Sequence, residues 1–569
     1  MADAVFITPN FSGIVREEPV GTLLLATILR NAGISADILQ FYHFGDANQF
    51  DEFVSSAVQQ VLEKRPKIVS FYTRCDSYHI SLRIAERIKS RCKDIYIVFA
   101  GPQADLVAES TIREIPYIDF ICRGEGETTI VPFFSSLISG KPDLTVKGLV
   151  YRHDGQIVQT PRPELIADLD TLPAIDYSLL AFNNEGASIK GENLFPVDVG
   201  RGCPFACTYC STKLFWGRKY RLKSADRIIE EIKFVHERFG MEAFIFVHDM
   251  FTMNREKVID ICKRLKNIGF PIRWRCSARM DCLDEELIDI MTDAGMYGLF
   301  VGIETGSSRM QKLIHKNLKL DDIPKKLRYI ANKGVEISAS FIYGFPEETE
   351  DDFVQTMSLM MEISKISGVN IQQHLCTFFP GTELTSQYID KLEPSTTFSD
   401  ITGGIAVQDC ADLIMAHPYL FSHFFEYKNE LREKVKYFSE FFTCWRMLQP
   451  VYGYITKKYY ANQLCQMLYD FSAKNQDLLM ANAPIETLLR HDQFLELFSN
   501  DECYLILKEV ARFCVWKKYA EIGSAELFKC DVQDVLDDKP IDQVQPSFTF
   551  VKCAKADGNN RELVIRKTK

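Results

Sequence analysis

Two long runs of alternating apolar strands and amphipathic helices constrain the fold of this chain more than any other feature. The first run covers about residues 4–140 and the second covers about 196–377, where six strand–helix units follow one another. Strands and helices that alternate at this spacing form parallel sheets covered by helices. The sequence therefore predicts an α/β protein, with an N-terminal doubly wound sheet followed by a partial (β/α)6 barrel.

Residues 141–190 interrupt this alternation. Two short apolar segments, 148–153 and 156–160, flank His153-Asp154-Gly155, which predicts a β-hairpin. Prolines 161, 163 and 173 then punctuate a connector that ends near Leu180. We interpret this stretch as an interdomain linker with a small hairpin.

The chain beyond about Pro394 is aromatic-rich and mostly helical in pattern. We predict helices at 419–442, 459–474 and 502–522, then a closing hairpin, 548–553 and 563–566, around the turn Asp557-Gly558-Asn559-Asn560. We expect this region to cap the barrel and shape substrate access. The predicted parts are a doubly wound domain (1–140), a linker (141–190), a barrel (191–390) and a mostly helical C-terminal domain (391–569).

Charge and cysteine usage restrict the class of partner and the compartment. The formal net charge is -11, and the basic residues are scattered among acids, which argues against binding of nucleic acid. The N-terminus lacks the features of a signal peptide, and the longest apolar runs, such as 22–29, are too short for a membrane span. Seventeen cysteines without an export signal indicate a reducing, cytoplasmic setting.

Three cysteines follow the first barrel strand at C-x3-C-x2-C spacing: Cys203, Cys207 and Cys210. Such a loop ligates three irons of a [4Fe–4S] cluster and leaves the fourth iron open. An open iron accepts a bidentate amino-acid ligand, and S-adenosylmethionine (SAM) offers its amine and carboxylate. Electron transfer from the cluster to the sulfonium then breaks a carbon–sulfur bond and releases a 5′-deoxyadenosyl radical. The cofactor thus supplies the difficult chemistry, and the protein orients it.

Two simpler explanations of the three cysteines are weaker. With 17 cysteines in the chain, this spacing arises by chance on the order of 0.015 times. A zinc site requires a fourth Cys or His at ligand spacing, and none follows nearby. The later cysteines form no C-x2-C pair, so auxiliary clusters are not expected.

With this loop and the turns that follow it, residues 196 to about 385 resemble the core of the radical SAM superfamily. Tyr209 matches the aromatic residue that lines the adenine, and 246–251 resembles the second-strand motif, with His248 in place of its first acid. Segments 301–306, 342–346 and 380–382 match later strand turns. The resemblance implies SAM contacts by Tyr209, Asp249, Arg275, Ser277, Glu304 and Gly344.

Residues 3–140 resemble the cobalamin-binding (B12-binding), Rossmann-like domain that precedes the barrel in one class of radical SAM enzymes. The resemblance rests on Glu18-Pro19-Val20-Gly21, the strand end at 70–75, Ala100-Gly101-Pro102 and 123–127. It implies cobalamin contacts by Thr73, Gly101, Pro102 and Glu125. The alternative is that these are turn residues of any doubly wound domain, with 123–127 as an architectural turn between domains.

The absence of two sequence motifs limits the classes of ligand that the N-terminal sheet is expected to bind. No G-x-G-x-x-G follows the first strand, which argues against a dinucleotide. The D-x-H-x-x-G sequence that gives a histidine to cobalt in other corrinoid domains is also absent, and His43 has the wrong spacing. The resemblance therefore implies base-off cobalamin without histidine ligation.

The combined resemblance implies a cobalamin-dependent methyltransferase. Cobalamin takes a methyl group from one SAM, and the radical from a second SAM abstracts hydrogen from an unactivated carbon, which captures that methyl group. The substrate is a small molecule or a peptide, and an external flavodoxin- or ferredoxin-type donor supplies electrons. The absence of an obvious acid–base dyad agrees with radical chemistry.

Three alternatives remain open at this point. The same architecture serves non-methylating radical chemistry such as cyclisation or ring rearrangement. A second alternative keeps the barrel chemistry without cobalamin. A third is a non-catalytic corrinoid or iron–sulfur sensor, against which the complete cluster motif and the lack of a DNA-binding segment argue.

Overall fold

The computed structural model describes the chain in two units, 1–429 and 430–569. The described residues are 2–11, 20–43, 49–179, 188–189, 192–395, 409–461, 463–481, 488–489, 491–501, 504–505, 507–508, 548–554 and 561–567. Glu18, Pro19, Leu180, the turn 557–560 and most of the helix predicted at 502–522 lie outside them. Within the described part of the chain, no helix is long and apolar enough to cross a membrane.

The N-terminal sheet has seven strands in the order β2-β1-β3-β4-β5-β6-β7. The first five are parallel, and the topological switch point lies between β1 and β3. The hairpin predicted at 148–160 is present, but it extends this sheet beyond β5 in antiparallel register instead of standing apart in the linker. The strands are β1 (Ala4–Phe11), β2 (Ala36–His43), β3 (Ile68–Tyr72), β4 (Tyr96–Ala100), β5 (Phe120–Cys122), β6 (Leu149–His153) and β7 (Gln156–Gln159).

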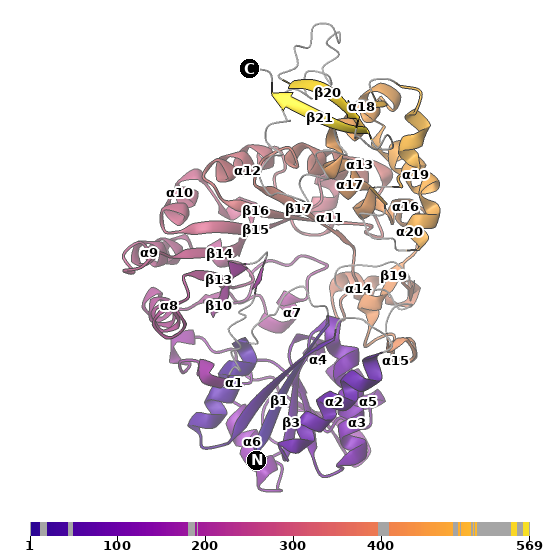
Figure 1. The fold of residues 1–569 in the computed structure, drawn as a ribbon. Coiled ribbons are helices and arrows are strands. Elements are labelled where there is room, and N and C mark those ends of the chain that lie inside the picture. Colours follow the sequence, from indigo (N-terminus) through magenta and orange to yellow (C-terminus); the bar gives the residue numbers. More distant parts are fainter. Residues whose placement is uncertain are drawn as a thin grey trace. The chain divides into compact units, whose positions relative to one another are not determined.

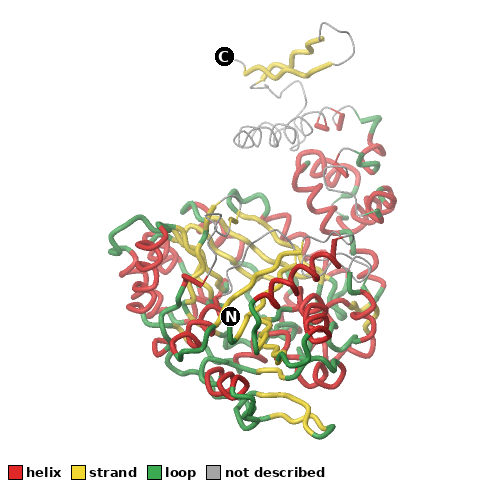
Figure 2. Tube along the Cα trace, turned by 60° about the horizontal axis from the view of Figure 1, so that its bottom comes forward, coloured by secondary structure: helices red, strands yellow, loops and turns green. Residues whose placement is uncertain are grey.

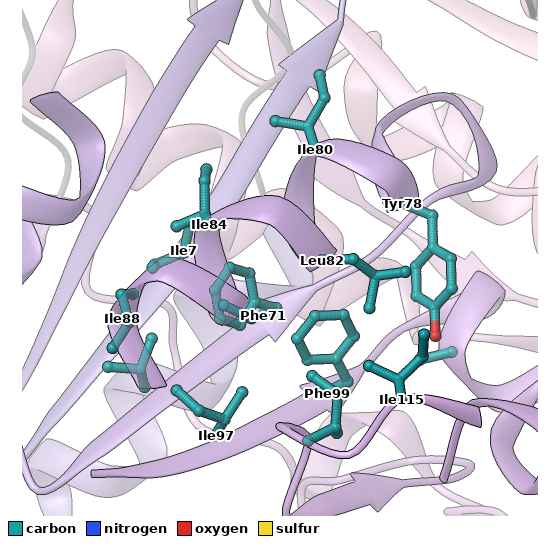
Figure 3. Packing of buried hydrophobic residues seen from close by; sticks show 14 of the residues in the cluster. Ile7, Phe71, Tyr78, Ile80, Leu82, Ile84, Ile88, Ile97, Phe99 and Ile115 are labelled. Carbon is teal, nitrogen blue, oxygen red and sulfur yellow. The ribbon is translucent and has the colours of Figure 1, made fainter. Parts of the chain in front are cut away.

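Helices cover both faces of this sheet because alternate strand residues point to opposite sides. Ile7 and Phe71 pack with Tyr78 and Ile84 on the side of α2, α3 and α5 (Figure 3). Phe6 belongs to a second apolar core on the side of α1 and α6. The helices are α1 (Val20–Asn31), α2 (Phe50–Glu63), α3 (Tyr78–Arg91), α4 (Pro102–Leu106), α5 (Ala108–Glu114) and α6 (Ile130–Ile138).

The barrel is an open sheet of six parallel strands in sequence order, as predicted (Figure 1). Its strands are β10 (Phe195–Asp198), β13 (Ala243–Val247), β14 (Arg273–Ala278), β15 (Met296–Glu304), β16 (Glu336–Tyr343) and β17 (Val369–Leu375). The helices are α8 (Ala225–Phe239), α9 (Arg255–Leu265), α10 (Glu285–Asp293), α11 (Ser308–Leu313), α12 (Ile323–Asn332) and α13 (Glu350–Ile363). Figure 2 shows the same alternation of yellow strands and red helices.

Short elements follow the first barrel strand and the last one. A small antiparallel pair flanks α7 (Thr212–Trp216), and a two-residue pair precedes the barrel. These pairs are β11 (Gly200–Arg201) with β12 (Arg221–Leu222), and β8 (Ser188–Ile189) with β9 (Glu192–Asn193). After β17 come α14 (Glu383–Tyr388), β18 (Leu392–Pro394), α15 (Ala411–Ala416) and β19 (Phe425–Tyr427).

The helix predicted at 419–442 is wrong in its first half. Residues 422–424 form a 3-10 turn, and β19 pairs with β18 in antiparallel register. Phe421 and Phe424 join the apolar core of the N-terminal sheet. Contacts with segments distant in sequence thus decide the local structure, and His417 caps the end of α15 while His423 lies in the 3-10 turn.

The second unit is helical around an aromatic core, as predicted for this region. Phe441, Tyr452, Phe471 and Phe494 pack edge to face or stacked at centroid distances of 5.4–6.4 Å. Its helices are α16 (Glu430–Val435), α17 (Phe438–Met447), α18 (Gln449–Tyr459), α19 (Leu464–Lys474) and α20 (Gln476–Met480), and β20 (Phe548–Ala554) pairs with β21 (Arg561–Lys567) as the predicted closing hairpin. The domain boundaries at 140, 190 and 390 stay a prediction.

Candidate active site

The cluster loop, residues 199–210, leaves the carboxyl end of β10 and carries the three predicted cysteines. Gly202 adopts φ +86, and a Cβ there would lie 2.0 Å from the Lys219 carbonyl oxygen, so only glycine fits this turn. Burial, with a smaller contribution from Cys210 and Cys207, raises the pKa of the Cys203 thiol to about 11. Buried thiolates of this kind require a metal or a cation beside them.

The cluster loop supplies three free thiols, from Cys203, Cys207 and Cys210. Each protein ligand of a [4Fe–4S] cluster binds a separate iron, so three thiolates suit three corners of one cluster. Among the described residues, no group of three Cys, His, Asp or Glu side chains is arranged to hold a single metal ion.

Asp249 ties the two ends of the cluster region together. Its Oδ2 accepts a hydrogen bond from Gly202 N at 2.9 Å, and its Oδ1 accepts one from Thr212 Oγ1 at 3.4 Å. The neighbouring His248 is buried, and burial lowers its pKa. Its Nδ1 accepts a hydrogen bond from Met250 N at 2.8 Å, so it shapes the strand end instead of standing in for an acid.

Glu304 ends β15 beside the cluster loop in a strained conformation. It has φ +70, and the register between β15 and β16 shifts between Gly302 and Glu304. Strain of this kind is typical of functional sites. Its Oε1 pairs with Lys316 Nζ at 2.8 Å, and both side chains are buried. Burial, followed by the hydrogen-bonded Glu304 carboxylate, raises the pKa of Tyr209 well above its usual value.

The structure brings Tyr209, Asp249 and Glu304 together with the cysteines, and Gly344 lies nearby. Gly344 adopts φ +77 and donates its N–H to Glu348 Oε2 at 2.6 Å. The next residue, Phe345, packs edge-on against Tyr209 with ring centroids 6.1 Å apart. The turn after β16 therefore supports the aromatic ring expected to face adenine.

Arg275 and Ser277 lie within β14, whereas the cluster loop begins beyond the carboxyl end of β10. A Cβ on Gly298 would lie 2.4 Å from Arg275 Nε, and the guanidinium carbon is 5.6 Å from the Tyr297 ring, near the amino end of β15. Ser277 pairs in register with Phe300. SAM contacts by these two residues stay a prediction.

Arg279 and Lys316 are the residues beside the cysteines that sequence reasoning missed. Arg279 follows the end of β14, and its Nη1 lies 4.0 Å from Cys207 Sγ. Lys316 follows α11 and neutralises Glu304. Their signals were a basic residue just past a predicted strand and another just past a predicted helix, which are too common to single out.

At the N-terminal sheet, the predicted residues hold the carboxyl end of β3 against the end of β4 and the start of α4. Thr73 Oγ1 donates to Ala100 O at 2.9 Å and accepts from Ala104 N at 3.0 Å, and its side chain is fully buried. Gly101 has φ +97, and a Cβ there would lie 2.8 Å from Thr73 N and O. Pro102 is the first residue of α4. Cobalamin contacts by these residues stay a prediction.

Glu125 joins the N-terminal sheet to the barrel. Arg201 Nη1 lies 2.7 Å from its Oε1, and Arg221 Nη1 lies 2.8 Å from its Oε2. Although burial acts in the opposite direction, the hydrogen bonds from Arg221 and Arg201 hold the pKa of Glu125 below its usual range. Both carboxylate oxygens are engaged, which gives Glu125 the architectural role, and its cobalamin contact stays a prediction.

Three buried hydroxyls of the N-terminal domain have no hydrogen-bond partner among the residues that the structure describes. They belong to Thr8 in the middle of β1, Thr22 in the first turn of α1 and Ser77 in the short turn that follows β3. Native structures leave few buried polar atoms unpaired. A ligand rich in amide groups, such as a corrinoid, fits an edge that presents such hydroxyls at the topological switch point.

The segment after α15 closes over this edge. His423 Nε2 donates to Cys75 O at 2.9 Å, and Gln103 Nε2 donates to Leu420 O at 2.8 Å. Ser422 Oγ donates to Phe378 O at 2.7 Å, just beyond β17. Residues 420–423 therefore connect the N-terminal sheet with the last barrel turn.

Comparison with known proteins identifies both α/β regions. The model of the radical SAM superfamily matches residues 197–360, and the model of the B12-binding domain matches residues 15–133. An uncharacterized methyltransferase of Pyrococcus horikoshii is 30% identical over 335 residues, which cover 59% of this chain and 72% of that protein. The chain belongs to the cobalamin-binding radical SAM family. The resemblance predicted from the sequence is thus confirmed.

One further relative and one solved structure are also similar to this chain. An anaerobic magnesium-protoporphyrin IX monomethyl ester cyclase of Rubrivivax gelatinosus is 25% identical, with 68% of this chain and 70% of that protein covered. The radical SAM methyltransferase TsrM of Kitasatospora setae, solved with cobalamin and a [4Fe–4S] cluster, has a TM-score of 0.56 at 14% identity, with 71% of this chain and 78% of that chain covered. The structural match confirms the predicted fold class.

The cofactors of the family are those predicted: a [4Fe–4S] cluster, SAM and cobalamin. The residues present fit them. Cys203, Cys207 and Cys210 would hold the cluster, and Tyr209, Asp249 and Glu304 lie beside the loop that carries them. When bound, these cofactors supply an organic radical and a transferable methyl group.

Proposed function

We propose that this radical SAM enzyme is a cobalamin-dependent methyltransferase acting on an unactivated carbon of a small-molecule or peptide substrate. The observation that carries the proposal is the close approach of the two cofactor regions. Helix α7, just after the cluster loop, packs against α4, just after Gly101 (Figure 1). A Cβ on Gly381 would lie 3.3 Å from Leu214 Cδ1 and 3.9 Å from Leu106 Cδ2.

The chain's own contribution is to position the cofactors and to exclude water. Asp249 fixes both ends of the cluster region, and Glu304 and Lys316 form a buried ion pair beside Tyr209. Residues 420–423 cover the junction between the two regions. Proximity and water exclusion of this kind contribute much of the catalytic effect in radical chemistry.

A second candidate is non-methylating radical chemistry on the same architecture. It is favoured by the relative that bears the name of a cyclase, whose matched region covers 68% of this chain. The methylating proposal is favoured by the relative from Pyrococcus horikoshii, which is named a methyltransferase.

Product analysis separates the two candidates. The purified protein is reconstituted anaerobically with iron, sulfide and hydroxocobalamin. It is then reduced with dithionite in the presence of SAM and of candidate small-molecule or peptide substrates. Methyl transfer yields both 5′-deoxyadenosine and S-adenosylhomocysteine. Deoxyadenosine without S-adenosylhomocysteine would assign the non-methylating chemistry, and protein that binds no corrinoid would rule out the methylating proposal.

We propose that an acidic one-electron donor of the flavodoxin or ferredoxin type reduces the enzyme in a reducing cytoplasm. The stretch 199–225 contains no acidic residue, although the whole chain has a net charge of -11. Arg218 and Lys219 are exposed there, and Arg218 Nε donates to Pro204 O at 3.0 Å, beside Cys203. An exposed basic turn next to the cluster complements an acidic donor.

Charge reversal tests this partner. The double variant Arg218→Glu with Lys219→Glu should slow reduction of the cluster by flavodoxin about tenfold at low salt, with the difference shrinking as salt rises. Reduction by titanium(III) citrate should change by less than a factor of about two. Lys325→Glu, an exposed position on α12, is the matched control. Equal rates with flavodoxin would contradict the assigned surface.

A further inference from the structure

Arg279 is a buried cation in direct contact with a cluster cysteine. Its Nη1 lies 4.0 Å from Cys207 Sγ, and its side chain is 6% exposed. The guanidinium carbon lies 3.7 Å from the centroid of the Phe205 ring, within the cluster loop itself. The arginine therefore faces the sulfur from a fixed position inside the protein.

Three contacts besides the sulfur hold this guanidinium. Its Nε and Nη2 donate to the two carboxylate oxygens of Asp281 at 3.0 and 2.9 Å. Nη2 also donates to Lys316 O at 2.7 Å. These contacts use the Nε–Nη2 edge of the fork, so Nη1 stays directed at the cysteine.

The turn that receives Arg279 also supports the cysteine and the acid pair. Cys207 Sγ lies 3.9 Å from His315 O, and His315 adopts φ +55. The next residue, Lys316, accepts from Arg279 through its carbonyl and pairs with Glu304 through Nζ. The Cys207 sulfur, Arg279 and Glu304 thus all contact one strained turn.

We propose that Arg279 is a positioning residue that raises the reduction potential of the [4Fe–4S] cluster. The cluster accepts one electron from the external donor and gains one negative charge. A fixed positive charge and an N–H directed at a ligand sulfur stabilise the reduced, more negative state over the oxidised one. The low dielectric of a buried site strengthens this effect. The inference rests on the cluster alone and holds whether or not methyl transfer is the reaction.

The experiment is a potentiometric titration of the reconstituted holoprotein without SAM, followed by electron paramagnetic resonance. Arg279→Gln should make reduction at least tenfold less favourable, which lowers the midpoint potential by about 59 mV or more for this one-electron couple. Arg279→Lys, which keeps the charge without the fork, should fall between Arg279→Gln and the unmodified protein. Arg273→Gln, at the other end of β14, removes the same charge and should leave the potential unchanged.

Iron content is measured in every variant. A full complement of iron in Arg279→Gln with an unchanged midpoint overturns the proposal. If Arg279→Gln binds no cluster, the test relies on Arg279→Lys. A midpoint potential in Arg279→Lys equal to that of the unmodified protein would show that the contact of the guanidinium with the cysteine has no effect. Loss of methyl transfer with an unchanged potential would likewise assign Arg279 to another role.

Discussion

The barrel and the N-terminal sheet are both parallel sheets that present their carboxyl edges to one another, yet they build those edges differently. The barrel edge carries charged side chains in pairs, such as the buried pair of Glu304 with Lys316 and the pair of the buried Arg279 with the exposed Asp281. The N-terminal edge carries small residues used in turns, such as Gly101. It also carries buried hydroxyls, as at Thr22, that have no partner within the described part of the chain.

This difference follows from what each edge has to hold. A cluster and a sulfonium cofactor are charged, so their site needs charges fixed in a low dielectric. A corrinoid is a large ring system with many peripheral amides, so its site needs close backbone approach and hydrogen-bonding groups. The charged site of the barrel can therefore be recognised in the sequence by motifs, whereas the corrinoid site is marked mainly by small residues.

The largest expected effect separates the two edges completely. Changing Cys203, Cys207 and Cys210 together to Ala should abolish cluster binding and deoxyadenosine formation, because the irons lose all three thiolates. Cobalamin should still bind, since its edge belongs to another sheet. Cys262→Ala, a buried thiol on α9, is the control. Iron analysis and absorbance spectra measure both, and loss of cobalamin along with iron would show that the edges are not independent.

The next effect tests the charges of the barrel edge. Lys316→Met should lower the free energy of unfolding by about 3–5 kcal/mol, because it leaves Glu304 buried and unpaired. Adding Glu304→Gln should restore most of that loss. Urea denaturation of the protein without cofactors measures the free energy of unfolding of both variants. A value for Lys316→Met within about 1 kcal/mol of the unmodified protein would contradict the prediction.

A glycine tests the N-terminal edge in the same way. Gly101→Ala should cost about 3 kcal/mol, since the new Cβ meets Thr73 at 2.8 Å and the residue has φ +97. Gly33→Ala, with φ +79 in open space, should cost about 1 kcal/mol. Urea denaturation measures the free energy of unfolding of both variants. Equal losses would show that the close approach to Thr73 does not contribute to the cost of Gly101→Ala.

His423 gives this junction a dependence on pH. Burial lowers its pKa to about 4, whereas an unfolded histidine titrates near 6.5. The unfolded chain therefore binds the proton first, so stability is complete above about pH 6.5 and is lost as the pH falls toward 4. Between pH 7 and 5 we expect a loss of about 2 kcal/mol. His423→Gln should lack this component, and urea denaturation at both pH values checks it.

The smallest effect concerns the unpaired hydroxyls. Thr22→Val should weaken cobalamin binding about fivefold, equivalent to about 1 kcal/mol, if that hydroxyl meets a corrinoid amide. Thr27→Val on the same helix removes a hydroxyl already bonded to Leu23 O and should affect stability instead. Titration with hydroxocobalamin measures both, and unchanged binding in Thr22→Val would leave that hydroxyl a packing feature.

The sequence names candidate residues at the barrel edge because its chemistry sits in short motifs at strand ends. The cysteine spacing is a local pattern, the family resemblance implies Tyr209, Asp249 and Glu304, and the structure brings these residues together. Their contacts with cofactors stay a prediction. The family resemblance implies Arg275 and Ser277 as SAM contacts, and Arg279, two residues beyond Ser277, was not among the predicted site residues. Only the length of β14 and the contact with Cys207 distinguish the two arginines.

What the sequence by itself determined is the order of the two parallel sheets, the cluster loop and the family to which they belong, because hydrophobic period and cysteine spacing are local properties. The tertiary structure alone decided that β6 and β7 extend the first sheet, that Glu125 pairs with Arg201 and Arg221, and that residues 420–423 cover the junction. Each of these depends on contacts between residues far apart in the chain. Buried charges and backbone groups find such partners only when the whole chain has folded.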